Sequence, residues 1–331
     1  MAGGLIVAAR QSNLELLRVL AAFMILMVHM NGASLGLPCP EDAWNAGQWW
    51  QTILEAFAII GVNLFVLISG YFSIRLTRRR IADYLIACGF YSIGIFMLVS
   101  CLKPSSFTMG KAVEALLFIS HTDLWFVRDY FLLMLLCPLI NPGVEALGRR
   151  SLDWLMLALV AVNCYFGWLW GGVVNPTGYN LMQMIFMYVA GAWIRRTPMS
   201  TPLCIALYVL AEVAVVVSAH MMDPLKAYAY NSPAVVVASV ACFGIFRNMN
   251  FTSRIINIVA SGTFAVYLVH KNPAIWGGGL KPLVRSVAGT HSGIEFFLIC
   301  AAIAMLFFII PVVIDLMRVR LGIKAKNASS G

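Results

Sequence analysis

Residues 18–29 read RVLAAFMILMVH, an apolar run that begins with an arginine and ends with a histidine. Because an α-helix turns by about 100° per residue, eleven steps place Arg18 and His29 within roughly 20° of each other on one helix face. At a rise of about 1.5 Å per residue, the two side chains lie roughly 16 Å apart. An ionisable side chain inside a membrane costs roughly 2.5–3.5 kcal/mol on insertion scales, so it normally faces a protein interior or a watery cavity. The run therefore predicts a functional site on the first helix.

The composition of the whole chain indicates that this helix lies in a membrane. Apolar residues make up 61% of the 331 residues and charged residues only 11%, and the mean hydropathy is +0.85. Soluble domains carry about 25% charged residues. The apolar runs are long and continuous, unlike the segments of about ten alternating residues in an outer-membrane barrel. We therefore expect an all-α fold, a polytopic helical membrane protein without an appended soluble domain.

Ten apolar stretches are suited to membrane-spanning helices. They lie at residues 14–35, 50–73, 81–102, 124–140, 152–171, 179–194, 202–221, 233–248, 258–276 and 293–317. The chain is accordingly expected to divide into an N-terminal segment at 1–13, a ten-helix membrane domain at 14–317 and a basic tail at 318–331.

The lysines and arginines distinguish the two sides of the membrane. Basic residues gather at both ends of the chain and on alternate connections: Arg10, Arg75, Arg78, Arg79, Arg80, Arg149, Arg150, Arg195, Arg196, Arg247, Arg254, Arg318, Arg320, Lys324 and Lys326. Cytoplasmic connections of membrane proteins carry an excess of Lys and Arg, so both termini are expected in the cytoplasm. This requires an even number of spans and agrees with ten. The formal charge of +9 then reflects topology, and no nucleic-acid partner is expected.

The eight cysteines give no sign of a metal site or of a disulfide framework. They are scattered over positions 39, 88, 101, 137, 164, 204, 242 and 300, without a CxxC pair. Seven of them fall in or at the ends of expected helices, where cysteine behaves as a small apolar residue. We therefore expect no bound metal.

Glu15, Arg18 and His29 form one stripe along the first helix. Two interpretations apply to it. Glu15 and Arg18 have the spacing of an ion pair at a helix start, with His29 as a cap near the membrane surface. Alternatively, His29 is a functional group, because histidine takes up and returns a proton near neutral pH, as acid–base catalysis requires.

The second expected helix contains a buried amide and ends at an arginine cluster. Asn63 lies in an apolar run, where its amide needs a hydrogen-bond partner, and helix packing alone explains such a residue. The cluster consists of Arg75, Arg78, Arg79 and Arg80, without a lysine. Membrane topology explains a basic cluster at this place. Guanidinium groups also suit bidentate binding of phosphate better than ammonium groups do.

Several motifs along the chain belong together. They are ELLR at 15–18, the Arg18–His29 spacing, NLFVLISGYF at 63–72, the Arg75-x-x-Arg78 pair, LWFV at 124–127 and GTFAVYLVH at 262–270. In this combination they resemble the acyltransferase type 3 family, whose members are integral-membrane O-acyltransferases. The resemblance extends over all ten expected helices, and the motifs of the first two helices are the more specific ones.

This resemblance implies a reaction and a catalytic group. The reaction would transfer an acetyl group from cytoplasmic acetyl-CoA to a hydroxyl of an exported or cell-surface glycan, in the inner membrane of a bacterium. His29 would be the catalytic residue, with Arg18 and Glu15 in the same essential group. Whether His29 deprotonates the attacking hydroxyl or carries the acetyl group itself stays open. The identity of the glycan and the oligomeric state stay open as well.

The resemblance also implies binding roles for other residues. Arg75, Arg78 and Arg79 would hold the phosphates of CoA on the cytoplasmic side.

Asp123 and Trp125, at the start of the fourth expected helix, are candidates for binding the acceptor. An indole stacks on sugar faces and a carboxylate binds hydroxyls. An interfacial aromatic belt is the alternative explanation for this position.

Tyr267 and His270 match a YLxH ending of the family and are candidates for a place near His29. Hydrogen-bonded packing is the alternative for a histidine in an apolar helix.

A small-molecule transporter or permease is the alternative function. Transporters tend to show paired halves with Gly- or Pro-interrupted helices at corresponding places, and this sequence shows no such repeat. A flippase or a membrane sensor without chemistry would leave the stripe from Glu15 to His29 unexplained. The sequence therefore favours an enzyme.

Overall fold

Helices make up the regular structure of this chain. The computed structural model describes residues 11–120, 124–170 and 174–329, and no strand occurs among them. The helices are α1 (Ser12–Met30), α2 (Gly32–Leu35), α3 (Ala46–Ile59), α4 (Gly61–Phe72), α5 (Arg78–Leu102), α6 (Met109–Leu116), α7 (Trp125–Ala146), α8 (Arg149–Val160), α9 (Leu181–Arg196), α10 (Thr201–Met221), α11 (Pro224–Ala227), α12 (Pro233–Arg247), α13 (Arg254–Ser261), α14 (Thr263–His270), α15 (Pro273–Ile275), α16 (Lys281–Thr290) and α17 (Gly293–Ser329). Shorter helical turns are π-helical at Ala161–Leu169 and Trp276–Leu280 and 3-10 at Pro104–Ser106. The prediction of an all-α fold is confirmed.

Seven helical runs of the described residues are long and apolar enough to cross a membrane. They are Ser12–Leu35, Ala46–Phe72, Arg78–Leu102, Trp125–Ala146, Arg149–Leu169, Thr201–Met221 and Gly293–Gly322. The other three predicted spans coincide with α9 and with the shorter apolar runs Pro233–Arg247 and Arg254–His270. The chain is thus a multi-pass helical membrane protein, as predicted, and the number of ten crossings stays a prediction.

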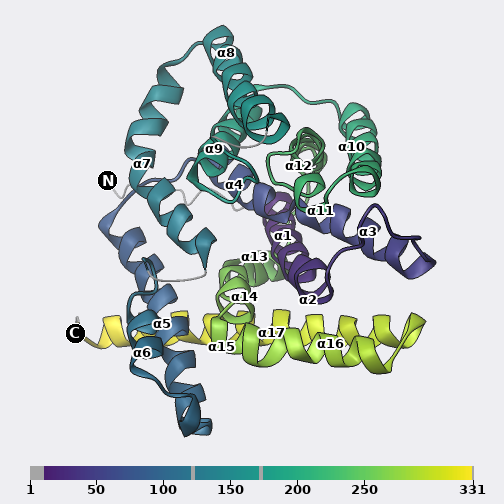
Figure 1. The fold of residues 1–331 in the computed structure, drawn as a ribbon. Helices are drawn as coiled ribbons and strands as arrows, with labels where there is room; N and C mark the ends of the chain where they lie inside the picture. Colours follow the sequence, from purple (N-terminus) through teal and green to yellow (C-terminus); the bar gives the residue numbers. More distant parts are fainter. Residues whose placement is uncertain (1–10, 121–123, 171–173, 330–331) are drawn as a thin grey trace.

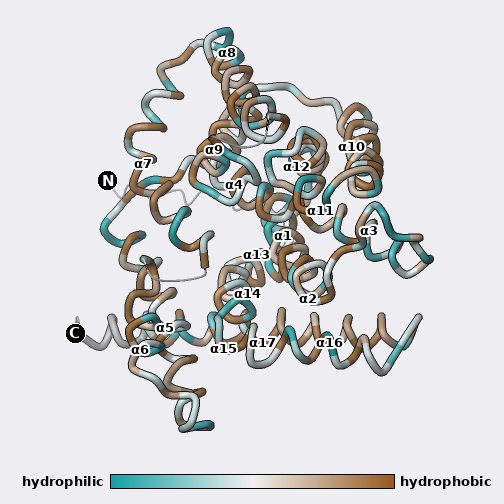
Figure 2. The backbone as a smooth tube through the Cα atoms, viewed as in Figure 1, coloured by the Kyte–Doolittle hydropathy of each residue, from teal (hydrophilic) through white to brown (hydrophobic). Residues whose placement is uncertain are grey.

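The outward faces of the peripheral helices are apolar. Leu139 of α7, Leu210 of α10 and Leu306 of α17 are 75%, 66% and 57% exposed. The same helices are mainly brown, the colour of hydrophobic residues, in Figure 2. A soluble protein rarely exposes apolar patches of more than a few hundred Å² to water, so these faces are suited to contact with lipid.

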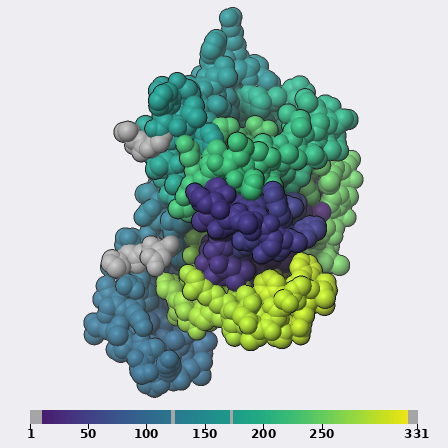
Figure 3. Space-filling view, turned by 45° about the vertical axis from the view of Figure 1, so that its right-hand side comes forward, coloured from purple at the N-terminus to yellow at the C-terminus, as the bar shows by residue number. Residues whose placement is uncertain are grey.

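The helix that carries His29 lies in the middle of the bundle. α1 contacts α3, α4, α12, α13, α14 and α17 (Figure 1), and in the space-filling view the N-terminal helices lie between green and yellow parts of the chain (Figure 3). Hydrogen bonds fix its N-terminal end. Ser12 Oγ donates to Asn257 Oδ1 at 3.0 Å, and Asn13 Nδ2 donates to the Phe246 carbonyl at 3.0 Å. α1 is therefore held against α12 and the start of α13 at the end opposite His29.

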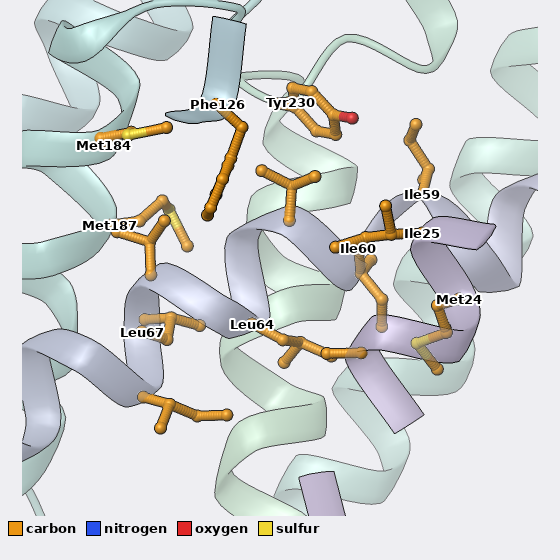
Figure 4. Close-up of a cluster of buried hydrophobic side chains, with 14 of the residues drawn as sticks. Met24, Ile25, Ile59, Ile60, Leu64, Leu67, Phe126, Met184, Met187 and Tyr230 are labelled. Carbon is orange, nitrogen blue, oxygen red and sulfur yellow. The ribbon is translucent and has the colours of Figure 1, made fainter. Parts of the chain in front are cut away.

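Two glycines bring α4 and α9 into direct backbone contact. A Cβ atom at Gly70 would overlap the carbonyl of Tyr188, and a Cβ atom at Gly191 would overlap the carbonyl of Leu67. Small residues allow this close approach between membrane helices. Beside the crossing, Met187 of α9 faces Leu67 of α4 (Figure 4). The position of α4 against α9 thus depends on the absence of two side chains.

Replacing Gly191 with alanine is expected to destabilise the protein by about 3 kcal/mol or more, because the added methyl group meets backbone that cannot move aside. The measurement is the thermal midpoint and the monodisperse yield in detergent. Gly94 of α5 has open space around its Cβ position and serves as the matched control. Gly94→Ala is expected to be neutral or slightly stabilising, since alanine favours a helix by about 1 kcal/mol over glycine. Equal midpoints for the two variants would contradict the close crossing.

Candidate active site

His29 of α1 faces His270 of α14. Nδ1 of His29 lies 3.1 Å from Nε2 of His270, and the two ring centroids are 5.0 Å apart. Nδ1 of His270 lies 2.6 Å from the main-chain carbonyl of Val266, one turn earlier in α14. His270 is completely buried, whereas His29 keeps part of its surface open. The structure thus brings together two histidines that are 241 residues apart in sequence.

The direction of these hydrogen bonds follows from the carbonyl group. A carbonyl oxygen only accepts, so Nδ1 of His270 carries the proton that is shared with Val266. In the neutral ring of His270, Nε2 is then an acceptor, and Nδ1 of His29 donates to it. Neutral His29 consequently has its lone pair on Nε2. The pair holds His29 in the tautomer that accepts a proton from, or attacks, a group on its open side.

His29 opens onto a narrow cavity of about 20 Å³, enough for about one water molecule. The lining residues are Ala22, Ile25, His29, Val62, Phe65, Trp125, Phe126, Tyr230, Thr263, Phe264 and Tyr267. A largely apolar wall with a few convergent polar groups is typical of a small-molecule site. Among the described residues, no three His, Cys, Asp or Glu side chains lie together as ligands for a metal ion.

Aromatic rings hold His29 in place from two sides. The ring of Trp276 meets it edge to face at 5.6 Å between centroids, and the ring of Tyr267 lies at 6.5 Å. The ammonium group of Lys271 lies 4.8 Å from the indole centroid of Trp276, in a cation–π contact. Tyr267 was predicted as a site residue, whereas no sequence signal beyond its aromatic character pointed to Trp276.

Trp125 lines the same cavity as part of an aromatic cluster. Its ring lies 5.2 Å from that of Tyr179 and 5.9 Å from that of Tyr230, and the two tyrosine rings are 4.6 Å apart. Burial raises the pKa of the Tyr230 hydroxyl well above its usual range, so this group remains a protonated donor. Asp123, the other predicted residue of this region, lies outside the described residues.

Asn63 belongs to the hydrogen-bond network behind the cavity. Its Nδ2 donates to the Tyr230 carbonyl at 3.0 Å and to Ser239 Oγ at 3.3 Å, and its Oδ1 accepts from Gln183 Nε2 at 3.1 Å. Gln183 Nε2 also donates to the Tyr230 carbonyl, at 2.9 Å. The side chain of Asn63 is only 1% exposed. The structure therefore places Asn63 as a support for the Tyr230 backbone and not among the residues that line the cavity.

Glu15 and Arg18 form an ion pair away from the histidines. Arg18 Nη1 donates to Glu15 Oε2 at 2.6 Å, within α1. α1 is continuous from Ser12 to Met30, so Arg18 and His29 are separated by about 16 Å along one helix face. Neither Glu15 nor Arg18 is among the described residues that line the His29 cavity.

A second and wider cavity of about 370 Å³ lies between α5, α7, α13, α14 and α17. Its charged residues are Arg80, Asp83, Asp315 and Arg318. Arg318 Nε donates to Asp315 Oδ1 at 2.8 Å, and Arg80 Nη1 donates to the carbonyl of Arg75 at 3.1 Å. The cavity thus offers two guanidinium groups from opposite ends of the sequence.

The three arginines predicted to bind phosphate lie at the surface beside this second cavity. Arg75, Arg78 and Arg79 are exposed, and Arg79 pairs with Asp83 at 3.8 Å. Their neighbour Arg80 lines the cavity. Arg318 was expected only as part of the basic tail.

A paired histidine on the wall of a cavity inside a multi-pass helical bundle is suited to an enzyme that works within the membrane. The comparison with known families agrees with this class. The model of a family described as an acyltransferase domain matches residues 11–318, nearly the whole chain. The protein belongs to the acyltransferase type 3 family and is a membrane O-acyltransferase. Searches of curated proteins and of solved structures return no match for this chain.

Proposed function

We propose that the protein transfers an acetyl group from acetyl-CoA to a hydroxyl of an exported or cell-surface glycan. The observation that carries this proposal is the His29–His270 pair. It leaves the lone pair of His29 Nε2 free on the side of a cavity that a substrate hydroxyl can enter. An acyl transfer to a hydroxyl needs a base at this point, because an alcohol is a weak nucleophile until its proton is removed.

The proposed step uses the histidine as a general base. Nε2 of His29 takes the proton of the acceptor hydroxyl while the hydroxyl oxygen attacks the carbonyl carbon of the thioester. The new C–O bond forms and the C–S bond breaks. The CoA thiolate then takes up the proton from His29. The products are the acetyl ester and free CoA. While His29 is protonated, its hydrogen bond to His270 is charge-assisted and therefore stronger.

The donor, acetyl-CoA, is proposed to bind with its phosphate groups in the second cavity. CoA carries several phosphate groups, and Arg80 and Arg318 supply guanidinium groups that bind phosphate bidentately. Arg75, Arg78 and Arg79 lie at the surface nearby, where they would attract the same phosphates as the donor approaches.

The acceptor is proposed to bind at the aromatic cluster of Trp125, Tyr179 and Tyr230. Aromatic faces stack on the apolar faces of sugar rings, and the protonated hydroxyl of Tyr230 is able to donate to a sugar oxygen. Asp123 is the proposed carboxylate partner for sugar hydroxyls at the start of α7.

The proposed location is the inner membrane of a bacterium, with both termini in the cytoplasm. The support is the basic charge at Arg80 and at Arg318, since cytoplasmic ends of membrane helices carry the excess of Lys and Arg. This orientation gives acetyl-CoA access to the second cavity from the cytoplasm. A cytoplasm-specific reporter fused to the C-terminus tests it, and a reporter signal from outside would contradict it.

The test of this function is a transfer assay. The purified protein is reconstituted in liposomes with radiolabelled acetyl-CoA and with the membrane glycans of a cell that expresses it. Label that enters the glycan fraction and is released by mild alkali supports O-acetyl transfer. A well-folded sample that neither binds nor turns over acetyl-CoA in the presence of glycans would favour the transporter.

Removing both cavity arginines is expected to raise the KM for acetyl-CoA by about tenfold or more, since each charged hydrogen bond contributes about 1.5–3 kcal/mol. The variants are Arg80→Ala with Arg318→Ala. With acetyl-pantetheine, which lacks the phosphates, the double variant and the wild type are expected to have equal kcat/KM. Arg320→Ala removes the same charge two residues along α17 and is the control. An unchanged KM for acetyl-CoA in the double variant would remove the cavity arginines from the donor site.

The exposed arginines are tested in the same assay. The double variant Arg75→Ala with Arg78→Ala is expected to have a higher KM for acetyl-CoA at low salt. The difference from the wild type is expected to shrink as salt is added, because salt screens exposed charges. An unchanged KM at low salt would leave these residues with a topological role alone.

A further inference from the structure

The two cavities share one lining residue. Phe264, the second residue of α14, is the residue common to the His29 cavity and to the second cavity in the described part of the chain. Thr263 beside it lines the His29 cavity, and Ala265 lines the second cavity. The start of α14 therefore forms a partition, and the ring of Phe264 is the part that both spaces touch.

The partition separates the groups that the proposed reaction must bring together. His29 lines one cavity, and Arg80 and Arg318 line the other. For a donor whose phosphates are held by these arginines, the ring of Phe264 lies between the second cavity and His29.

Phe264 is the member of an aromatic wall that has no side-chain hydrogen bond to hold it. Its ring stacks on Tyr84 at 5.4 Å between centroids, and Tyr84 in turn stacks on Tyr130 at 6.0 Å. Hydrogen bonds hold the two tyrosines. Tyr84 Oη donates to the Val127 carbonyl at 2.7 Å, and Tyr130 Oη lies 2.9 Å from Ser69 Oγ. A phenylalanine has no such bond to lose, so the ring of Phe264 moves at the cost of its packing contacts alone.

We propose that the acyl group enters the His29 cavity past the ring of Phe264, which moves aside to admit it. The same ring limits the size of the acyl group. This inference rests on the proposed function for its substrates. In the resting protein the ring keeps the water of the basic cavity away from His29. The arriving donor arm displaces the ring, and the narrow space that remains admits a short acyl group and excludes a longer one.

Phe264→Ala is expected to join the two cavities, with two consequences for activity. The ratio of butyryl to acetyl transfer is expected to rise by about tenfold, the scale on which a pocket discriminates between substrates that differ by a methylene or two. The ratio of acetyl-CoA hydrolysis to acetyl transfer is expected to rise severalfold over the wild-type ratio. In that side reaction water replaces the acceptor hydroxyl at the thioester carbon, and acetate and free CoA are formed.

Phe131→Ala is the matched control. Phe131 stacks on the same Tyr84 ring at 6.0 Å but lines neither cavity. Its removal is expected to leave both ratios at the wild-type values. The inference is overturned if Phe264→Ala keeps the wild-type acyl preference and hydrolysis ratio, or if Phe131→Ala changes them equally. Phe264→Leu serves as the second variant, with smaller changes in the same direction, should the alanine variant fail to fold.

A labelling experiment tests the partition without any turnover. Val62 lines the His29 cavity only, so a charged methanethiosulfonate reagent added on the basic side reaches Val62→Cys through the partition. Labelling is read from the mass of the peptide that contains position 62. The rate is expected to rise severalfold when Phe264→Ala is added to Val62→Cys and to stay unchanged with Phe131→Ala. An equal labelling rate in Val62→Cys alone, with Phe264→Ala and with Phe131→Ala overturns the partition. The labelling needs no turnover, so the expected rates would hold even if the proposed acetyl transfer proved wrong.

Discussion

Replacing His29 with alanine is expected to lower kcat for acetyl transfer by about 10²–10⁴-fold, the contribution of a positioned general base. Protein yield and membrane insertion are expected to stay normal, because His29 is only partly buried and the hydrogen bond of its side chain to His270 is one of many contacts between α1 and α14. The KM for acetyl-CoA is expected to change little, since the arginines proposed to bind its phosphates line the other cavity. The measurement is the steady-state rate of label transfer by purified protein.

The control for this experiment is another histidine of the same chain. His291 pairs with Glu295 at 3.1 Å and lines neither cavity. His291→Ala is expected to keep the wild-type rate. A His29→Ala protein that retains more than about a tenth of the wild-type kcat would exclude His29 as the base.

Replacing His270 with phenylalanine is expected to lower kcat by about 10²-fold, with KM unchanged. The reason is the tautomer of His29. Without the acceptor at Nε2 of His270, Nδ1 of His29 loses one partner for its proton, and the tautomer with the proton on Nε2, which blocks the lone pair that faces the cavity, becomes more populated. The aspartate of a serine-protease triad orients its histidine in the same manner. His270 is thus a positioning residue, because it acts through His29.

Partial rescue separates this positioning role from a packing role. The side-chain oxygen of a glutamine reaches about as far as Nε2 of histidine and accepts a hydrogen bond. His270→Gln is therefore expected to recover about tenfold of the loss relative to His270→Phe. If packing alone mattered, the phenylalanine variant, which fills the space better, would be the more active of the two. That order of activities would contradict the positioning role.

The membrane helices were predictable because a membrane imposes a simple rule on sequence. A span needs about 20 apolar residues, and the runs at 14–35 and 293–317 meet this rule at sight. Interruptions inside a run follow no such rule. The chain leaves regular α-helix at Ile60 and at Gly262, and neither break changes the hydropathy of its run. α16 also escaped prediction, since its ten residues are too polar for a span.

The candidate site was predictable in part. Helix periodicity placed Arg18 and His29 on one face, but it says nothing of which distant residue meets that face. His270 was predicted from a family motif, whereas the places of Tyr230 and Trp276 at the site became apparent only in the tertiary fold. The choice between Arg79 and Arg80 depends on helix register, because one residue turns a side chain by about 100°. Thr77 sets that register by accepting a hydrogen bond from the Arg80 main-chain nitrogen at 3.2 Å.

The hydrogen bonds of Ser12 and Asn13 fix one end of α1, so the length of this helix determines the depth of His29 in the membrane. His29 comes 17 residues after Ser12, which is about 26 Å along the helix axis. The hydrocarbon layer of a bilayer is about 30 Å thick. With α1 fixed at its basic end, His29 thus lies near the opposite surface, and the proposed glycan acceptor would not need to sink into the bilayer to reach it. In the proposed reaction the small acyl group would make the crossing instead, over a distance set by the length of one helix.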